Sequence, residues 1–402
     1  MTRTVTLERF VRAAPEDAYR AFTNATALRE FLCDAATLKP RLGGRLYAAW
    51  DTGYYAAGEY TALEENRRVA FSWMGRGAPG PSQVEVTFTL GAGGTSVRVA
   101  QAGFGEGPAW DAALEQAREG WQRGLENLAS VLETGEDLRV SLRPMMGVFY
   151  GEFTPETAAR LGVPVAAGVC LGGVMPGMGA EGAGLAKDDV LVQLGGAPLA
   201  DWADLTPALS RCRAGDVVEV VAYRGAQRLV LPMKLVKRPL PAVPASAAEL
   251  AAQVQARLSA GLAELDAALA GVSEREAAFS PAPDGWSVCQ VLAHLILGAR
   301  YELFYIEQLL TSQEHLIDDF GGNSLPPLAA LLAVYPSLAE LRAEFGRCLR
   351  AVPAALAALP ADFPARRRAS FTRLAYNYLQ DDNHMRDHAA QVAAAVAAAR
   401  QA

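Results

Sequence analysis

Three of the four histidines in this 402-residue sequence occupy positions from which they could bind one metal ion. His384 and His388 are separated by three residues, so a helix would place both imidazoles on one face, a common arrangement for two metal ligands. His294 lies about 90 residues earlier, beside an apolar stripe in a second helical pattern. The spacing of the late pair is a weak signal alone, and the third histidine strengthens it.

The late pair lies in a segment whose apolar residues follow the period of one long last helix: Leu374, Tyr378, Met385, Val392 and Val396. His388 falls close to this stripe, and His384 and Asp381 lie on the adjoining face. Burying such groups without partners costs a few kcal/mol each, and a metal bound by neutral imidazoles would remove that cost. We therefore predict a divalent metal site formed by His294, His384 and His388, with Asp381 orienting a ligand imidazole. The alternative is a metal-free bundle whose histidines are hydrogen-bonded to Asp381 or Asn377.

Ser287 is predicted to begin the helix that carries His294. A serine followed three residues later by Gln290 has the spacing of a capping box. Val288, Val291 and Leu295 then form an apolar stripe with helical period.

Composition divides the chain into three segments with different patterns. Residues 1–136 contain alternating runs such as QVEVTFTL, which predict antiparallel strands, followed by a long helix over about 110–133. Residues 140–238 contain short β-like runs separated by glycines. A proline-rich linker at 239–246 precedes an alanine-rich helical segment, 247–402. These patterns predict a multidomain α+β chain, with strands closed by a long helix, then a small β-rich domain, then an all-α segment. The family resemblances given below imply a helix-grip α/β fold for the first domain and an up-down four-helix bundle for the last.

The bulk composition limits the classes of partner. The net charge is −7 and no segment is strongly basic, so we expect no nucleic acid partner. The uncharged stretch 161–180 contains six glycines and two prolines, which favours strands and turns over a membrane helix. Five widely spaced cysteines and the lack of a signal-peptide pattern predict free thiols and a cytoplasmic location without a membrane partner.

The first segment resembles the START-like helix-grip family, in particular the homologues of the activator of heat-shock-protein-90 ATPase. Gly43-Gly44 before a strand, Phe71-Ser72-Trp73 and a helix with Gly120-Trp121 carry the resemblance, in that order. The family's curved sheet around a long helix implies an apolar cavity for a small ligand. Its candidate lining residues are Trp50, Tyr60 and Trp73, and the alternative is that these three are ordinary core aromatics.

The second segment resembles a PDZ domain of the bacterial HtrA-like type. Its loop Met145-Met146-Gly147-Val148 matches the family's carboxylate-binding loop, which implies that backbone N–H groups there bind a peptide's C-terminal carboxylate. The peptide would add as a strand to the sheet edge. The alternative is a PDZ fold whose groove is unused. Two further residues are expected to face the groove from a helix, Leu205 and Leu209. Asp188 replaces the glycine that the family has in a turn.

The third segment resembles the DinB superfamily of metal-binding four-helix bundles. Trp286, Ser287 and His294 match the family's early motif, and His384 and His388 match its late one. The resemblance implies three histidine ligands and open coordination positions, as in catalytic metal sites. The expected cofactor is a divalent metal ion, with zinc and nickel favoured, although imidazoles suit iron and copper as well.

Two functions remain open from the sequence. The first is a metal-dependent thiol transferase or hydrolase, in which the other two domains recruit a C-terminal peptide or a small apolar ligand. The second is a non-catalytic adaptor, or a stress-related protein resembling a co-chaperone, that binds these partners. No residue is assigned as a catalytic acid or base, and the oligomeric state is left open.

Overall fold

A computed structural model of the chain describes residues 2–282, 285–315, 324–380 and 384–402. The chain forms two compact units, described separately below. The first unit combines Met1–Gly135 with Pro241–Ala402, and the second unit is Glu136–Leu240. The multidomain α+β class predicted from the sequence is confirmed.

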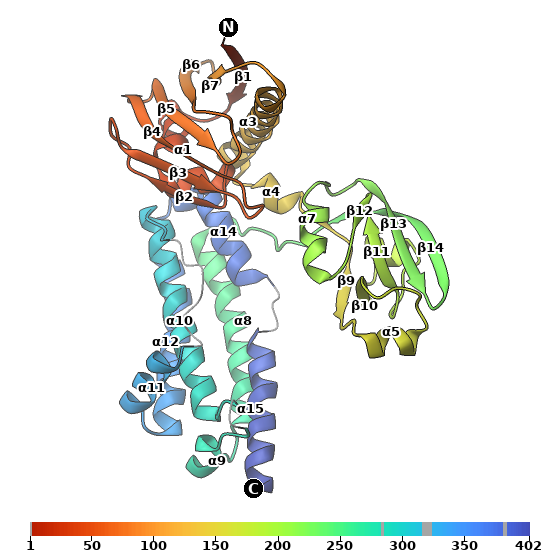
Figure 1. Ribbon diagram of the computed structural model, residues 1–402. Coiled ribbons are helices and arrows are strands. Elements are labelled where there is room, and N and C mark those ends of the chain that lie inside the picture. Colours follow the sequence, from red (N-terminus) through yellow and green to blue (C-terminus); the bar gives the residue numbers. More distant parts are fainter. Residues whose placement is uncertain (1, 283–284, 316–323, 381–383) are drawn as a thin grey trace. The chain divides into compact units, whose positions relative to one another are not determined.

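A seven-stranded antiparallel sheet and a long helix build the first part of the first unit (Figure 1). The strand order is β1-β7-β6-β5-β4-β3-β2. The predicted alternation is seen in β6, where Val84, Val86 and Phe88 are buried and the residues between them are more exposed. The bounds are β1 Arg3–Val11, α1 Pro15–Thr23, α2 Ala25–Phe31, β2 Ala35–Leu38, β3 Arg45–Ala49, β4 Tyr55–Glu64, β5 Arg68–Gly75, β6 Ser82–Gly91, β7 Gly94–Phe104 and α3 Pro108–Thr134.

The second unit is a small sheet with short helices. Its main sheet has the order β14-β13-β11-β10-β9, so β9 lies at an edge, and β12 pairs with β11. A separate pair joins β8 to β15. The bounds are α4 Leu138–Ser141, β8 Pro144–Met145, β9 Val148–Gly151, α5 Pro155–Leu161, β10 Val169–Val174, α6 Gly179–Gly182, β11 Val190–Leu194, β12 Ala197–Pro198, η1 Trp202–Asp204, α7 Leu205–Leu209, β13 Val217–Arg224, β14 Gln227–Lys234 and β15 Val236–Lys237.

A bundle of long helices builds the remainder of the first unit (Figure 1). The predicted capping box at Ser287 is confirmed, since Ser287 Oγ accepts from the Gln290 N–H and Gln290 Oε1 accepts from the Ser287 N–H. The bounds are α8 Ala247–Ala268, α9 Glu274–Ala278, α10 Val288–Thr311, α11 Leu325–Val334, α12 Leu338–Ala357, α13 Phe363–Arg366, α14 Arg368–Leu379 and α15 His384–Gln401.

The prediction of one long last helix is wrong. α14 ends at Leu379, Gln380 is extended with ψ 136°, and α15 begins at His384. The two helices belong to different cores: Leu374 and Tyr378 pack with the N-terminal half of α8, whereas Val392 and Val396 pack with the N-terminal half of α10. The break lets each helix bury its own apolar face.

Buried polar contacts join the sheet-and-helix part of the first unit to its bundle. The Glu314 side chain is only 3% exposed and pairs with Arg373 at 2.5 Å and Arg29 at 3.2 Å. Ser370 Oγ donates to the buried Glu30 carboxyl. Burial raises the pKa of Glu30, whereas for Glu314 the opposing effect of Arg373 and Arg29 outweighs burial and lowers the pKa. The two parts therefore share one polar interface within the first unit.

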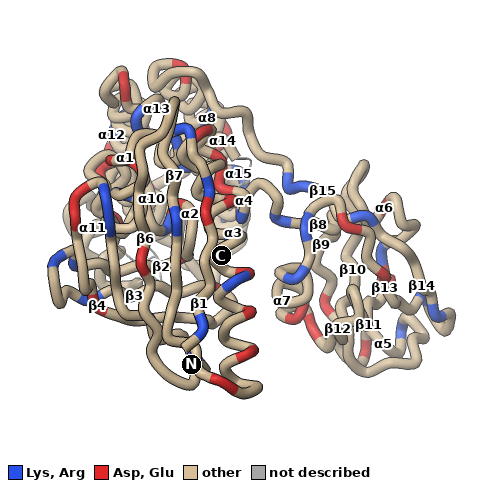
Figure 2. The backbone as a smooth tube through the Cα atoms, turned by 90° about the horizontal axis from the view of Figure 1, so that it is seen from above, with Lys and Arg blue, Asp and Glu red and all other residues tan. Residues whose placement is uncertain are grey.

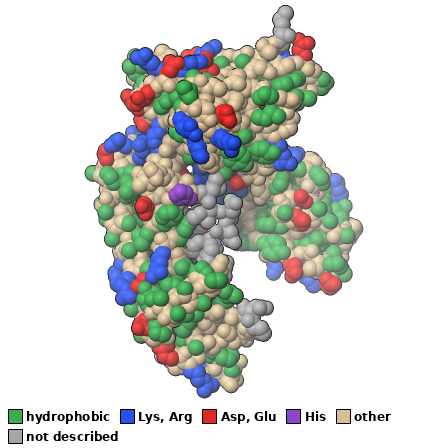
Figure 3. All heavy atoms as spheres, turned by 60° about the vertical axis from the view of Figure 1, so that its left-hand side comes forward, with side chains coloured by type: hydrophobic (Ala, Val, Ile, Leu, Met, Phe, Trp, Pro, Cys, Tyr) green, Lys and Arg blue, Asp and Glu red, His purple; other side chains and the backbone are tan. Residues whose placement is uncertain are grey.

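Charged residues of both signs are interspersed along the chain. Figure 2 shows Lys and Arg and Asp and Glu scattered along the backbone, and the face in Figure 3 likewise carries scattered charges among apolar groups. No helix among the described residues is long and apolar enough to span a membrane. All five cysteines are free thiols, as expected.

Candidate metal centre

The three histidines singled out in the sequence lie together within the bundle, where the start of α15 meets α10. α10 supplies His294, and the first five residues of α15 include His384 and His388. One ring nitrogen from each lies within 4.8 Å of the others. The His384 and His388 ring centroids are 4.5 Å apart, and those of His294 and His388 are 5.0 Å apart.

This donor set fits a divalent metal ion. Zinc binds imidazole nitrogens at about 2.0–2.1 Å, so two ligands of one ion lie at most about 4.2 Å apart. The three nitrogens are close to this limit, and small rotations of the rings would bring them within it. His294 is buried, His388 is half-buried and His384 is exposed, so solvent reaches the cluster from one side.

The second nitrogen of His388 has a partner that orients its ring. His388 Nδ1 lies 2.9 Å from Gln391 Oε1, which favours the tautomer with the proton on Nδ1 and leaves Nε2 to bind a metal. Burial lowers the pKa of His388, and the neighbouring imidazoles add to this effect against Gln391. The neutral imidazole is the form that binds metals.

Two other residues of the predicted site have different outcomes. Asp381, predicted to orient a ligand imidazole, lies outside the described residues. Trp286 packs against His294 with ring centroids 5.2 Å apart, so the first residue of the early motif forms one wall of the cluster.

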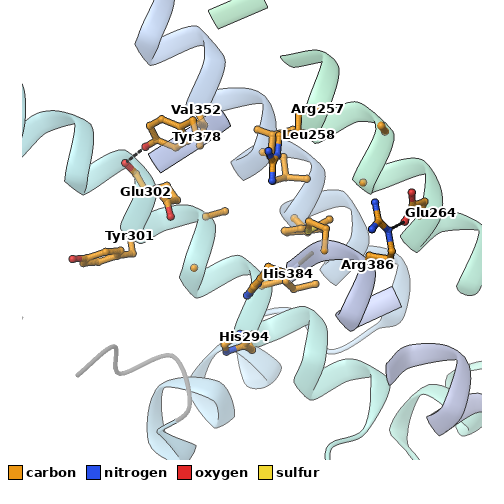
Figure 4. A pocket seen from close by; sticks show the side chains of 18 of the residues that line it. Arg257, Leu258, Glu264, His294, Tyr301, Glu302, Val352, Tyr378, His384 and Arg386 are labelled. Atoms are coloured by element: carbon orange, nitrogen blue, oxygen red, sulfur yellow. Dashed lines mark hydrogen bonds and ion pairs between the residues drawn. The ribbon is translucent and has the colours of Figure 1, made fainter. Parts of the chain in front are cut away.

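A cavity of about 550 Å³ adjoins the histidine cluster within the bundle. Figure 4 shows His294 and His384 at one end of its lining, with Tyr301, Glu302, Tyr378 and Arg257 toward the other end. Near the histidines, Arg386 pairs with Glu264 at 3.8 Å. A metal bound by the three histidines would therefore be accessible to a small molecule held in this cavity.

Glu302 and the hydroxyl of Tyr378 lie at the far end of this cavity, and neither was predicted from the sequence. Tyr378 donates to the Glu302 backbone carbonyl, and Asn377 donates to the Glu302 carboxylate at 2.9 Å. Burial and, to a lesser extent, Glu302 raise the pKa of Tyr378, so this hydroxyl stays protonated. The sequence did contain a signal for Glu302. His294, Gly298 and Glu302 are spaced by four residues, which places a histidine, a residue without a side chain and a carboxylate along one helix face.

The predicted carboxylate-binding loop of the second unit contains a position that requires glycine. Gly147 has φ +79°, and a Cβ there would lie 2.2 Å from the Met178 side chain. Met146 is buried, Met145 ends β8, and Val148 begins the edge strand β9. The loop thus leads directly into a strand edge.

The two predicted groove leucines lie in α7 beside this sheet. Leu205 is buried in the core of the unit, and Leu209 is half-buried against the same core. Asp188 has φ +69°, so it adopts the left-handed conformation that the expected glycine would take.

The three aromatic residues proposed to line an apolar pocket in the first segment pack against its core. Tyr60 is buried and its hydroxyl donates to the Phe22 carbonyl at 2.9 Å. Trp73 is buried, and its ring lies 6.3 Å from the ring of the half-buried Trp50.

Three protein-family models match successive parts of the chain. Residues 12–133 match the activator of Hsp90 ATPase homolog 1-like protein family, residues 144–235 match the PDZ domain, and residues 257–392 match the DinB superfamily. The chain carries one domain of each of these families. All three clustered histidines lie within the DinB domain.

Solved structures similar to this chain each cover about a third of it. Protein MLL2253 from Mesorhizobium loti is 31% identical, with 33% of this chain and 97% of that chain covered and a TM-score of 0.30. An HSP90 activator from Plasmodium falciparum is 23% identical, with 33% of this chain and 96% of that chain covered and a TM-score of 0.28. The Aha1 dimer from Colwellia psychrerythraea is 18% identical, with 33% of this chain and 96% of that chain covered and a TM-score of 0.29. A search of curated proteins found no match to the chain.

Proposed function

We propose that the DinB domain is a metal-dependent enzyme that acts on a small molecule, as a thiol transferase or a hydrolase. The observation that carries the proposal is the position of the three-histidine cluster beside a cavity of about 550 Å³. His294, His384 and His388 would hold a divalent ion, with zinc and nickel favoured.

Three protein ligands leave coordination positions open, as in catalytic zinc sites. A bound ion would lower the pKa of a coordinated water toward about 7 or hold a thiol as its thiolate. The chain's own residues would bind and orient the substrate: apolar side chains line the middle of the cavity, and Tyr378 and Asn377 fix the position of Glu302 at its far end. Gln391 keeps the His388 ring in the orientation that presents Nε2.

Metal removal and reloading test this proposal. We expect the chelated protein to lose turnover on a panel of thiol-transfer and ester substrates, and reloaded protein to regain it. Circular dichroism on the same samples checks that chelation leaves the secondary structure in place. No turnover across the full panel with one equivalent of metal bound would contradict the enzymatic proposal and favour the adaptor function.

We also propose that the PDZ domain binds the C-terminus of another protein. Gly147, which must be glycine, and the edge position of β9 support this proposal. Such a loop binds the terminal carboxylate through backbone N–H groups, and the peptide pairs with the strand edge.

Amidation of the peptide tests the role of the carboxylate. We expect members of a library of C-terminal peptides to bind the full chain with Kd values of order micromolar, and their amidated forms to bind at least about tenfold more weakly, because one charge-assisted interaction is lost. Fluorescence anisotropy with matched acid and amide peptides measures the difference. Equal affinity for both forms would remove the carboxylate loop from the proposal.

A further inference from the structure

A second and smaller cavity lies within the first unit, between helices α1, α2 and α3 and the segment where α13 leads into α14. Its volume is about 60 Å³. A buried water requires about 10–15 Å³ of such space, so this cavity has room for about four oxygen-sized atoms. Charged groups that line so small a space can reach the same ligand.

Arginines supply most of the charge in the lining of this small cavity, which contains Arg20, Arg366, Arg367 and Arg368. Two of the four have partners of their own. Arg366 forms an ion pair with Asp362 at 3.1 Å, and Arg368 donates to two backbone carbonyls. The other two come from different domains of the unit, since Arg20 lies on α1 and Arg367 lies directly before α14.

Arg20 and Arg367 have few partners for the five N–H donors that each guanidinium group carries. Arg20 donates from Nη2 to the neutral Ser312 Oγ at 2.6 Å. Arg367 donates to the Arg366 carbonyl at 3.5 Å and lies 3.9 Å from the Asp17 carboxylate. Both distances exceed those of charge-assisted hydrogen bonds. Within the part of the chain that the structure describes, neither guanidinium group therefore makes a hydrogen bond to a carboxylate.

The two guanidinium groups are also close enough to repel each other. Burial lowers the pKa of Arg20, and the like charge of Arg367 lowers it further, against the opposing effect of Glu30 and Asp17. Glu30 lines the cavity, but its carboxyl accepts from Ser370 Oγ, and burial raises its pKa and so favours its neutral form. The positive charge of the arginine pair is therefore only partly neutralised.

The start of α14 is a second feature that favours an anion. This helix has 12 residues, and its N-cap residue, Arg367, makes no side-chain cap hydrogen bond. The first N–H groups of an α-helix have no partner within the helix, and the macrodipole places partial positive charge there. Ala369, in this first turn, lines the cavity. The arginine pair and the helix start thus favour the same ligand charge.

We propose that this cavity binds one tetrahedral oxyanion, a phosphate or sulfate group, between Arg20 and Arg367. Guanidinium groups match the geometry of such anions, and four oxygen atoms match the volume of the cavity. The anion contacts one arginine of the activator-like domain and one of the DinB domain. It therefore stabilises the contact between these two domains, independently of any metal at the histidine cluster.

Thermal unfolding and isothermal titration calorimetry of the full-length chain test the site with inorganic phosphate and sulfate as probes. Sodium chloride keeps the ionic strength constant, so that general screening is the same in every sample. We expect about 10 mM of either anion to raise the Tm of the wild type by at least about 2 °C, because an anion that binds only the folded state stabilises it. Calorimetry should give a Kd of order 0.1–1 mM.

Variants of the two arginines assign the effect to this cavity. Arg20→Met and Arg367→Met should each raise the Kd for phosphate at least about tenfold and abolish the anion-dependent shift in Tm. Arg367→Met removes no hydrogen bond shorter than 3.5 Å, so it should fold even if Arg20→Met does not. Arg118→Met on α3 is the matched control, because it removes the same charge from an exposed pair with Glu115 outside the cavity. Its Kd for phosphate should stay within about twofold of the wild type.

Glycerol 3-phosphate distinguishes two sources of the bound group. Binding as tight as that of phosphate would assign the site to phosphomonoesters, and binding at least about tenfold weaker would assign it to the free ion, and both agree with an oxyanion site. Equal Tm values in phosphate, sulfate and chloride, without a heat of binding, would overturn the proposal. An anion effect of the same size in wild type, Arg20→Met and Arg367→Met would overturn it as well, because a general salt effect does not depend on these arginines.

Discussion

His384→Ala should reduce the metal content of the purified protein from about one equivalent to near zero, because two imidazoles hold an ion far less tightly than three. His384 lies within 4.5 Å of His388 by ring centroid, so its loss leaves a gap in the donor set. Elemental analysis after dialysis against a weak chelator measures the content. The same measurement on His294→Ala and His388→Ala should give the same loss.

The fourth histidine provides the matched control. His315 stacks against Phe304 and takes no part in the cluster, and its backbone N–H donates to Gln308 Oε1. His315→Ala should therefore keep the full metal content. Equal metal in wild type and His384→Ala, with His315→Ala also unchanged, would show that the three histidines are not the ligands.

Arg373→Met should lower the free energy of unfolding of the first unit by about 3 kcal/mol, because it leaves a buried carboxylate with one of its two guanidinium partners removed. Glu314 is 3% exposed and makes two hydrogen bonds to Arg373. The low pKa of Glu314 means that this stabilisation is present above its unfolded value of about 4.3 and is lost as the pH falls through the folded value. Urea denaturation at neutral pH measures the effect.

Two controls distinguish the loss of the ion pair from the loss of side-chain packing in Arg373→Met. Arg366→Met removes a guanidinium group from an exposed pair with Asp362 and should cost no more than about 1 kcal/mol. Glu314→Gln combined with Arg373→Met should cost less than the sum of the two single changes, by about 1–3 kcal/mol, since neither charge then stays buried alone. Strict additivity would mean that the pair contributes no coupling.

Local signals in the sequence were enough to place the elements that carry the histidine cluster. The serine cap of α10 and the spacing of His384 and His388 are short-range patterns, and the structure reproduces both. The break at Gln380 gave no such signal, because Tyr378 and Met385 are seven residues apart and continue a helical period across the interruption. A pattern of apolar residues does not show which of two cores each residue joins.

Contacts between distant segments were not predictable from local patterns. Glu314 and Arg373 look like ordinary surface charges in the sequence, and their burial follows from the packing of the bundle against α1 and α2. The positions of Arg257 and Glu302 in the cavity lining were not predictable either, because the packing of the whole bundle decides which faces of their helices line the cavity. At Asp188 the expected left-handed backbone conformation is present, although the residue is an aspartate instead of the glycine that the PDZ family has there.

The hydrogen bond between Ser370 and Glu30 joins residues 340 positions apart in the chain. At ribosomal rates of roughly 5–20 residues per second, about 17–70 seconds separate the synthesis of its two partners. The whole PDZ domain is made during this interval, whereas Glu30 has no contact with its partner Ser370 until α14 has been translated. The order of biosynthesis therefore favours completion of the inserted domain before the unit that surrounds it in sequence.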